Sequence, residues 1–428
     1  MYDLAVIGAG WAGFNAALKA KESGLKVCLI ECGVIGGTCL NRGCIPTKAL
    51  IASAKVYSLV RKSSVFGVES DNPRINFGKI QERKNKLIWD LSQGMLSRLG
   101  GIDLIKSSAE IVSEREIKVD TGKLSAKFIL VASGSRPAEL AQLKFDGVKI
   151  ISSDQLLSLP SVPKSLLIIG GGVIGCEFAS LFSALGSEVS LLEKLPMLLQ
   201  GEDKEISRKI EVIFKKKGIK VYTGSDLSVV DLNVYEKVLV CVGREPNISG
   251  LGLEKLGIKL DKKGIAVDDY LRTSVANIYA AGDCTAKIML AHYAAYQGVS
   301  AVENMIVDNK NKSNNPVVPA CIFCDPEIAS VGLDEEKAVV AGIPVKVFKF
   351  DFRASSMARI IDEVDGFIKV VVNRNSEEVV GGCIIGPRST ELISILAMAV
   401  SLHLKISQIR AIIFAHPTLS ESLRESIG

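Results

Sequence analysis

The glycine pattern GxGxxG occurs twice in this chain, each time directly after a short apolar run. The runs are residues 4–7 and 166–169, and a segment of mostly small or apolar residues follows each pattern. The glycines of the two copies are Gly8, Gly10, Gly13, Gly170, Gly172 and Gly175. A strand, a tight glycine turn and a helix in this order form the phosphate-binding end of a βαβ unit, because the first glycine permits the turn and the second lets the backbone approach a pyrophosphate. Two copies predict two such units.

An acidic residue completes each copy. Glu31 and Glu193 end a second apolar run, and each lies 23 residues after the first glycine of its copy (31 − 8 and 193 − 170). The pyrophosphate of a dinucleotide can bind at the free N–H groups of the helix terminus, while a carboxylate at this place accepts hydrogen bonds from ribose hydroxyls. Because a carboxylate repels a 2′-phosphate, Glu193 favours NAD over NADP. We therefore expect two bound dinucleotides.

The rest of the chain indicates how these units are joined. Residues 132–137 and 241–247 both follow apolar runs. We expect them to be equivalent segments by which the chain leaves the two units, and we call them the exits. Residues 308–315 are polar and precede prolines, which is typical of a linker. After this linker, β-rich runs such as 367–372 alternate with the apolar segment 389–404, which we expect to be a helix that contains His403. The chain is thus predicted to be an α/β protein with a C-terminal α+β unit.

Composition excludes several classes of protein. The 52 basic and 47 acidic residues give a formal charge of +5 without a long basic tract, so nucleic acid and anionic membranes are not predicted partners. Ten cysteines in 428 residues do not form the dense framework of a small secreted protein. Residues 166–186 are apolar, but Glu177 and the glycine cluster suit a strand, turn and helix better than a membrane span. We expect a soluble protein of the cytoplasm, or of the mitochondrial matrix if a leader has been removed.

Residues 36–48 read GGTCLNRGCIPTK and place Cys39 and Cys44 five positions apart. Five residues of a regular helix rise about 7.5 Å, which exceeds comfortable disulfide reach, so a bridge here requires a distorted turn. The glycines at positions 36, 37 and 43 supply the necessary freedom. A bridge that closes so small a loop fits a redox couple better than a structural staple. Two buried free thiols remain the alternative.

The other cysteines and the histidines carry weaker signals. Cys321 and Cys324 have CxxC spacing, but no second pair or histidine lies nearby, so core thiols are favoured over a zinc or redox site and no metal is expected. Of the three histidines, His416 is the best candidate acid or base because Glu421 follows closely enough to orient its ring. From spacing alone, a structural role for His416 is equally open.

Together these residues resemble the pyridine nucleotide-disulfide oxidoreductases, and within them the dihydrolipoamide dehydrogenase branch. The resemblance covers nearly the whole chain. Its motifs are GGTCLNRGCIPTK, the two GxGxxG units, AAGDC at 280–284, LAHYAAYQG at 290–298, DPEIASVG at 325–332 and HPTLSE at 416–421. The implied fold has two Rossmann-like dinucleotide-binding domains, for FAD and NAD, and a C-terminal α+β dimerisation domain. The implied boundaries are 1–148 and 248–314 for the two parts of the FAD-binding domain, 149–247 for the NAD-binding domain and 315–428 for the dimerisation domain.

The resemblance also implies the reaction. In a homodimer, Cys39 would exchange with the substrate and Cys44 would lie against the flavin, while His416 and Glu421 would serve the disulfide of the partner subunit. The substrate would be dihydrolipoamide on a lipoyl-bearing carrier of a 2-oxoacid dehydrogenase or glycine-cleavage system, oxidised with reduction of NAD+.

The same resemblance implies the cofactor contacts. Lys48 would lie near the flavin and pair with Glu177, and Asp283 would contact the ribityl chain. The other residues implied for FAD are Gly8, Gly10, Gly13, Glu31, Gly134 and Ala291, and those for NAD are Gly170, Gly172, Gly175, Glu193 and Gly243.

The chain also departs from the family pattern. Phe414 stands where a histidine is common, and Met357 falls in a stretch that often carries arginine, which weakens the substrate assignment. The segment between Tyr222 and Lys237 is short, so we expect an antiparallel excursion there to be trimmed. Two alternatives stay open: a related reductase of another disulfide, a quinone or a metal ion, and a catalytically silent FAD protein.

Overall fold

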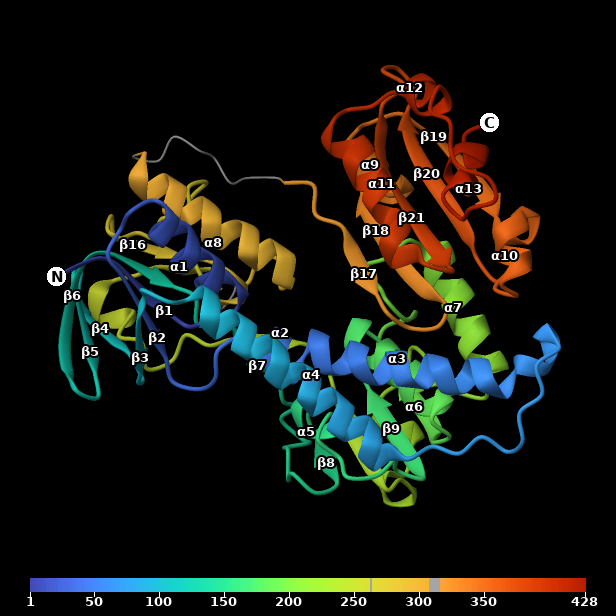
Figure 1. Cartoon of the computed structure of the whole chain (residues 1–428), viewed down its shortest axis with the longest axis horizontal. Coiled ribbons are helices and arrows are strands. Elements are labelled where there is room, and N and C mark those ends of the chain that lie inside the picture. Colours follow the sequence, from blue (N-terminus) through green and yellow to red (C-terminus); the bar gives the residue numbers. More distant parts are fainter. Residues whose placement is uncertain (262–263, 308–315) are drawn as a thin grey trace.

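The computed structural model describes residues 1–261, 264–307 and 316–428, and three sheets of five or more strands organise these residues (Figure 1). The predicted linker at 308–315 lies outside the described residues. Helices and strands alternate through the first two units, whereas the third sheet is antiparallel, so the predicted α/β class with a C-terminal α+β unit is confirmed.

The first sheet is built around β1, which pairs in parallel with β2 on one side and β6 on the other. Its strands are β1 (Tyr2–Ile7), β2 (Val27–Glu31), β3 (Asp103–Lys106), β4 (Glu110–Ser113), β5 (Glu116–Val119), β6 (Gly122–Val131) and β16 (Ile278–Ala280). The central strands bury apolar side chains on both faces, as parallel strands covered by other elements must. Helices α1 (Trp11–Glu22) and α8 (Ala291–Ile306) pack against each other over one face (Figure 1).

The second sheet is entirely parallel, in the order β11, β10, β9, β12, β8. Its strands are β8 (Ile150–Ile151), β9 (Ser165–Ile169), β10 (Glu188–Leu192), β11 (Lys220–Tyr222) and β12 (Lys237–Val240), and its helices are α5 (Ser153–Leu156), α6 (Val173–Ala184) and α7 (Lys204–Lys216). Residues 223–236 are all described and contain only the 3-10 turns η2 (Leu227–Val229) and η3 (Leu232–Val234). The predicted antiparallel excursion is therefore trimmed.

The two predicted exits pair with each other. The chain leaves the first sheet after β6 and forms β7 (Ser135–Pro137), and on leaving the second sheet after β12 it forms β13 (Arg244–Pro246). β7 and β13 are antiparallel neighbours, with Arg244 opposite Pro137. The chain then returns to the first sheet at β16, so the second unit is inserted within the first.

Three helices lie across the two units. They are α2 (Gly37–Arg42), α3 (Cys44–Arg61) and α4 (Phe77–Arg98). Helix α3 packs against both α4 and α6, which places the start of α3 where the first and second units meet (Figure 1).

The C-terminal unit is an antiparallel sheet in the order β17, β18, β21, β20, β19. Its strands are β17 (Ala320–Ile322), β18 (Glu327–Gly332), β19 (Val345–Asp351), β20 (Phe367–Asn373) and β21 (Val379–Gly386), and its helices are α9 (Glu335–Val340), α10 (Ser356–Ile360), α11 (Ser389–Ser401), α12 (Ile406–Arg410) and α13 (Glu421–Ser426). The smaller elements of the chain are η1 (Ser63–Phe66), η4 (Glu254–Leu256), η5 (Asp283–Thr285), η6 (Phe352–Ala354) and the pair β14 (Leu260–Asp261) and β15 (Gly264–Ile265).

The prediction that His403 lies within the apolar helix was wrong. Helix α11 ends at Ser401, and His403 has a φ of 53°, which no right-handed helix can continue. The N–H of Leu404 then bonds back to the carbonyl of Ala399 at 2.9 Å and closes the helix end. The predicted helix was too long because it followed the apolar residues, and hydropathy gives no sign of the left-handed backbone conformation that ends the helix.

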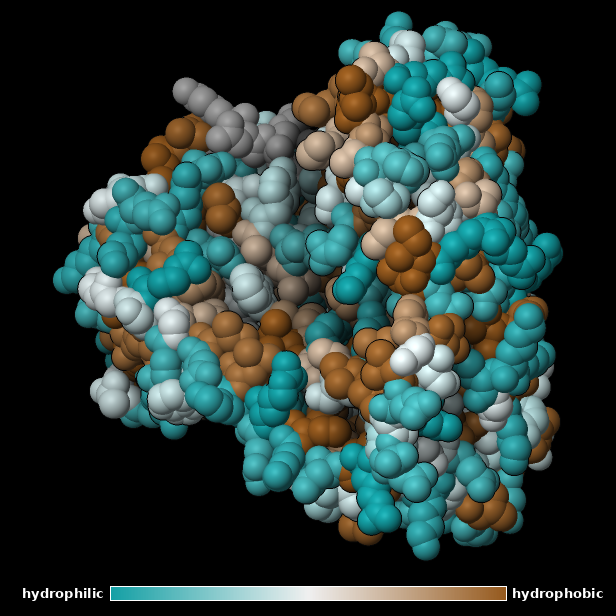
Figure 2. Space-filling model, turned by 45° about the vertical axis from the view of Figure 1, so that its right-hand side comes forward, coloured by the Kyte–Doolittle hydropathy of each residue, from teal (hydrophilic) through white to brown (hydrophobic). Residues whose placement is uncertain are grey.

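The surface mixes hydrophilic and hydrophobic residues, with a recess between the first unit and the C-terminal unit (Figure 2). Among the described residues, no helix combines the length and apolar character needed to cross a bilayer.

Candidate functional site

The helix carrying the cysteine pair is broken between the two sulfurs. Cys39 lies in α2 and Cys44 begins α3, while Gly43 between them has φ −145° and ψ −111°, outside the helical region. The turn into α2 uses Gly36 and Gly37, with φ values of 95° and 57°. The distorted turn that the spacing predicted is therefore present, and it brings the two free thiols into hydrogen-bond contact.

The two thiols differ in acidity because they share one hydrogen bond. Donation by the Cys39 thiol lowers the pKa of Cys44 to about 7, and the Lys48 ammonium acts in the same direction against the effect of burial. The same hydrogen bond, together with burial, raises the pKa of Cys39. The shared hydrogen bond thus favours the thiolate on Cys44 and the proton on Cys39, and thiolate is the reactive form in disulfide exchange.

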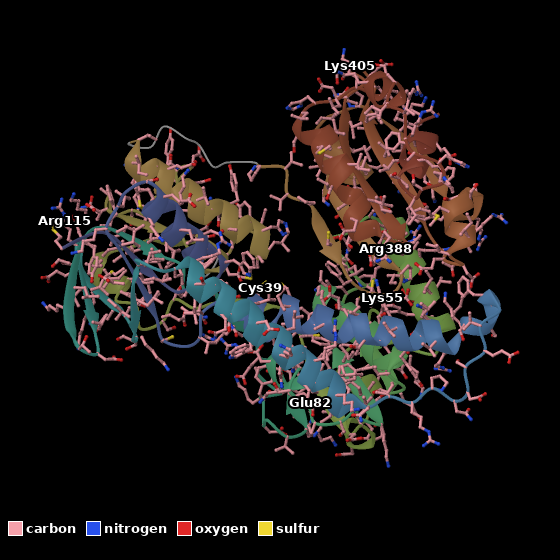
Figure 3. The ribbon with its side chains drawn as sticks, viewed as in Figure 1. Cys39, Lys55, Glu82, Arg115, Arg388 and Lys405 are labelled. Carbon is pink, nitrogen blue, oxygen red and sulfur yellow. The ribbon has the colours of Figure 1, made fainter. Side chains whose placement is uncertain are left out.

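An ion pair fixes Lys48 one turn along α3. Its Nζ lies 2.8 Å from both carboxylate oxygens of Glu177 in α6, as the resemblance implied, and 4.5 Å from the centroid of the Phe323 ring. Glu177 Oε1 also accepts the backbone N–H of Phe323 at 2.9 Å. Figure 3 shows Cys39 near the centre of the molecule and Lys55 farther along α3 below the C-terminal unit. Elements of all three units therefore converge beside the cysteine pair.

The first glycine turn has the shape of a pyrophosphate cradle. Gly8 has a φ of 102°, and a Cβ there would lie 2.3 Å from the carbonyl oxygen of Ala132, so only glycine fits. A Cβ at Gly10 would have 3.9 Å to its nearest neighbour, and no side chain caps the start of α1, so the N–H groups of its first turn are free for phosphate oxygens. Glu31 accepts the N–H of Ala9 and of Gly33, each at 2.7 Å, which holds its carboxylate beside the turn. These residues fit FAD.

The second glycine turn repeats the first. Gly170 has a φ of 115°, and a Cβ there would lie 2.5 Å from the carbonyl oxygen of Cys241, whereas Gly172 has open space and α6 has no side-chain cap. Glu193 accepts the N–H of Gly171 at 2.6 Å and of Leu195 at 2.7 Å. Gly13 and Gly175 pack against the carbonyls of Gly8 and Gly170, where a Cβ would lie 1.8 and 1.9 Å away. The second turn fits NAD equally well.

Asp283 belongs to a polar chain that sequence reasoning found only in part. Ser135 Oγ donates to Asp283 Oδ2 at 2.5 Å and accepts from Arg244 Nε at 2.7 Å. Arg244 Nη2 reaches Thr38 Oγ1 at 3.5 Å. Ser135 and Arg244 lie on the paired exits, and the only sequence signal for them was the similarity of those exits.

Three of the expected cofactor positions lie at element ends. Gly134 and Gly243 precede β7 and β13, with φ values of 72° and 132° and open space where a Cβ would lie. Ala291 is the first residue of α8.

His416 and Glu421 meet, but away from the cysteines of the same subunit. His416 Nδ1 lies 2.9 Å from Glu421 Oε2, and the hydrogen bond from His416 lowers the pKa of Glu421. The His416 side chain is 71% exposed in the single subunit. Figure 1 shows α13, which begins at Glu421, on the outer side of the C-terminal unit and far from α2. The pair therefore lies on the exposed surface of the C-terminal unit.

The remaining cysteines do not form a second site. Cys321 and Cys324 are free, and their sulfurs contact the backbone carbonyls of Thr390 and Pro326. Burial raises the pKa of Cys321 to about 11, so it is a poor nucleophile. Within residues 1–261, 264–307 and 316–428, no group of three or more histidine, cysteine or acidic side chains is arranged to hold a metal ion.

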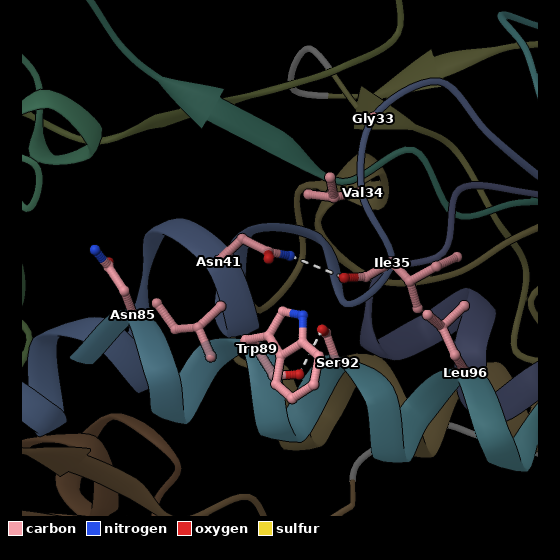
Figure 4. A pocket seen from close by; sticks show the side chains of 9 residues that line it. Gly33, Val34, Ile35, Asn41, Asn85, Trp89, Ser92 and Leu96 are labelled. Carbon is pink, nitrogen blue, oxygen red and sulfur yellow. Dashed lines mark hydrogen bonds between the residues drawn. The ribbon is translucent and has the colours of Figure 1, made fainter. Parts of the chain in front are cut away.

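A cavity of about 440 Å³ lies between the loop after β2 and helices α2 and α4 (Figure 4). Trp89 and Ser92 of α4 line it, together with Asn41, whose side chain donates to the carbonyl of Ile35 at 2.9 Å. No cysteine or titratable side chain lines it. The cavity is therefore separate from the sulfur chemistry.

Comparisons with known proteins agree with this geometry. Residues 2–298 match the family model described as pyridine nucleotide-disulphide oxidoreductase, and residues 318–427 match the dimerisation domain of the same family. The chain is 39% identical to dihydrolipoyl dehydrogenase of Chlamydia pneumoniae, over 98% of this chain and 95% of the relative, and 37% identical to dihydrolipoyl dehydrogenase of Bacillus subtilis, over 99% and 97%.

Solved structures are also similar. LpdA from Mycobacterium tuberculosis has a TM-score of 0.91 at 27% identity, covering 99% of this chain and 98% of that one. The HOCl-induced flavoprotein disulfide reductase RclA from Escherichia coli has a TM-score of 0.89 at 27% identity, covering 100% and 99%.

Proposed function

Because this chain belongs to the pyridine nucleotide-disulphide oxidoreductase family, we propose that it oxidises protein-bound dihydrolipoamide to lipoamide and reduces NAD+. Family membership makes it an FAD- and NAD-dependent disulfide oxidoreductase with a dimerisation domain. The lipoyl substrate is the proposed part. The observation that supports it most is the pairing of an acidic thiol, Cys44, with a proton-holding thiol, Cys39, in a chain that is 39% identical to a dihydrolipoyl dehydrogenase.

The protein residues divide the work as follows. His416 of the partner subunit, oriented by the partner's Glu421, takes a proton from the substrate dithiol, and the substrate thiolate attacks Cys39. The Cys39–Cys44 bond breaks and Cys44 leaves as a thiolate, which Lys48 stabilises. FAD, when bound, supplies the electron relay between the dithiol and NAD+. The residues that would hold FAD are Gly8, Gly10, Gly13, Glu31, Lys48, Gly134, Asp283 and Ala291, and those that would hold NAD are Gly170, Gly172, Gly175, Glu177, Glu193 and Gly243.

The proposed carrier is a lipoyl-bearing protein of a 2-oxoacid dehydrogenase or glycine-cleavage system, because dihydrolipoamide is covalently carried in such systems. We place the reaction in the cytoplasm, because ten cysteines in 428 residues do not form the dense disulfide framework of a small secreted protein.

The substitution Cys44→Ser tests the scheme. The variant should retain FAD and lose NAD reduction by dihydrolipoamide, because no second sulfur receives the electron pair. Cys32→Ser, which removes an exposed thiol outside the Cys39–Cys44 pair, is the control and should turn over normally. Wild-type turnover in Cys44→Ser contradicts the sulfur mechanism.

A second candidate is a reductase that uses NADH to reduce another acceptor, which the similarity to a flavoprotein disulfide reductase favours. Steady-state assays with lipoamide, oxidised glutathione, a quinone and Cu(II) at equal concentration separate the two. The lipoyl assignment requires the highest kcat/KM for lipoamide.

A further inference from the structure

Trp11 has the largest side chain of the first glycine turn, and the cofactor chemistry proposed above does not use it. It begins α1 and occupies a position in GxGxxG where the motif sets no requirement. Its ring is half-buried, but its Nε1–H is fully buried and meets no acceptor among the described residues with full hydrogen-bond geometry. A buried N–H without a partner is costly, so a charge that forms near it is strongly favoured.

Backbone contacts bring Trp11 and Cys39 together. The N–H of Gly36 donates to the carbonyl of Ala9 at 2.9 Å. A Cβ on Gly37 would lie 2.7 Å from the Cα of Gly10, so the starts of α1 and α2 are in direct contact. The hydrogen bond with Cys44 and burial raise the pKa of Cys39, whereas the Trp11 indole acts in the opposite direction and favours the thiolate.

Thiol–disulfide exchange needs Cys39 to carry charge at one step. After the substrate thiolate has attacked Cys39 and released Cys44, the substrate is joined to Cys39 in a mixed disulfide. The second substrate thiolate then attacks the substrate sulfur of that bond, the ring of lipoamide closes, and Cys39 departs with the electron pair as a thiolate. A leaving thiolate departs faster when it is stabilised.

We propose that Trp11 is a further catalytic residue, which donates its indole N–H to the Cys39 sulfur as that sulfur leaves the mixed disulfide. The inference rests on the proposed function for its substrate, but the contact between the starts of α1 and α2 does not depend on which disulfide is exchanged. A neighbouring donor matters most at this sulfur, because its hydrogen bond to Cys44 and its burial both oppose ionisation.

The pH dependence of Cys39 alkylation tests the proposal in the holoenzyme. In a Cys44→Ser background, iodoacetamide labelling of Cys39 is followed by peptide mass spectrometry across pH. Trp11→Phe should move the midpoint up by about one pH unit, so that labelling below both midpoints slows about tenfold. Trp89→Phe removes the other of the 2 tryptophans and should leave the midpoint unchanged.

An isostere protects the test against misfolding. In the Trp89→Phe chain, Trp11 can be replaced by benzothienylalanine, which keeps the ring shape and lacks the N–H. The same upward shift with normal FAD content supports donation by the indole, whereas an unchanged midpoint in this protein overturns it. Lipoamide turnover is assayed separately. If lipoamide is not turned over but the Trp11 substitution still shifts the Cys39 midpoint, only the lipoyl substrate is refuted. If lipoamide is turned over but the midpoint does not shift, only this inference is refuted.

Discussion

Lys48 and Glu177 form an ion pair that joins α3, which begins at Cys44, to α6 of the inserted unit, with Nζ 2.8 Å from both carboxylate oxygens. Glu177 is 6% exposed and Lys48 is 29% exposed, so the pair is shielded but still reached by water on one side. The contact therefore couples the position of Lys48, and through it the acidity of Cys44, to the placement of the second unit.

Glu177→Gln should lower the free energy of unfolding by about 2 kcal/mol. This is less than the 3–5 kcal/mol typical of breaking a fully buried pair, because solvent partly screens Lys48. Chemical denaturation measures it, and Asp90→Asn is the control, since the Lys86–Asp90 pair is exposed and should contribute less than about 0.5 kcal/mol. Equal losses in the two variants would contradict a shielded pair.

The reduced enzyme should titrate one thiolate near pH 7. Because the pKa of Cys44 is lowered from 9.0 to about 7, its thiolate is present above that pH and is lost as the pH falls through it. Thiolate absorbance of the dithiol form, with peptide-resolved alkylation to assign the residue, measures the midpoint. Lys48→Met should raise it, since the ammonium favours the anion. A midpoint near 9 in the unaltered protein would show that the hydrogen bond from Cys39 does not form.

Two inactive variants should complement each other. If His416 serves the sulfurs of the partner subunit, a heterodimer of Cys39→Ser and His416→Ala chains contains one complete site and one doubly defective site. Random re-association of equal amounts should restore about a quarter of wild-type turnover, because about half the dimers are mixed and each has one of two sites. Turnover that stays at the level of the separate variants would mean that His416 acts within its own subunit.

Among the charged residues between the second unit and the C-terminal unit, Lys369 should lower the free energy of unfolding most when it is replaced. It lies on β20, is 2% exposed, and its Nζ is 2.9 Å from Asp203, 2.7 Å from Glu205 and 3.5 Å from Glu335. Lys369→Met leaves Asp203 buried without a cation and should cost about 3–5 kcal/mol in chemical denaturation. Lys349→Met, which removes an exposed partner of Glu205, should cost less than about 1 kcal/mol.

Glu202→Gln should stabilise the protein above neutral pH. Burial raises the pKa of Glu202 although a hydrogen bond with Ser330 and the charge of Lys337 oppose the rise, and Asp334 and Asp203 add to it. When the pKa of a carboxyl group is higher in the folded than in the unfolded chain, its ionisation destabilises the folded state at every pH above the pKa of the unfolded chain. The variant should therefore melt higher than wild type at pH 8 and equally at pH 4, where both side chains are neutral. A lower Tm at pH 8 would show that the carboxylate is needed in its charged form.

Much of the fold was predictable, because a glycine-rich turn followed at a fixed distance by an acidic residue is typical of one structure, the dinucleotide-binding βαβ unit. Glu31 and Glu193 lie beside equivalent turns and accept equivalent N–H groups, as their equal spacing implied. The break in the helix between Cys39 and Cys44 was predictable for a similar reason, since the two residues are too far apart along a regular helix to meet.

Residues whose role depends on distant contacts could not be found in this way. Arg244 and Ser135 lie 109 positions apart and meet only because the two exits pair. Trp11 carries no motif requirement, and its relation to Cys39 appears only once α1 and α2 touch. The end of α11 before His403 was missed because a left-handed backbone position has no signature in hydropathy.

The antiparallel pair of β7 and β13 makes the inserted unit exchangeable by protein engineering. The chain enters and leaves the inserted unit through two neighbouring strands, with Arg244 opposite Pro137, so both junctions lie at one short seam. A foreign nucleotide-binding module whose own ends are a strand spacing apart can be spliced in at that seam without altering the register of β1, β6 and β16. Coenzyme preference is thus open to exchange as a block, while the flavin cradle and the sulfur pair stay in the host chain.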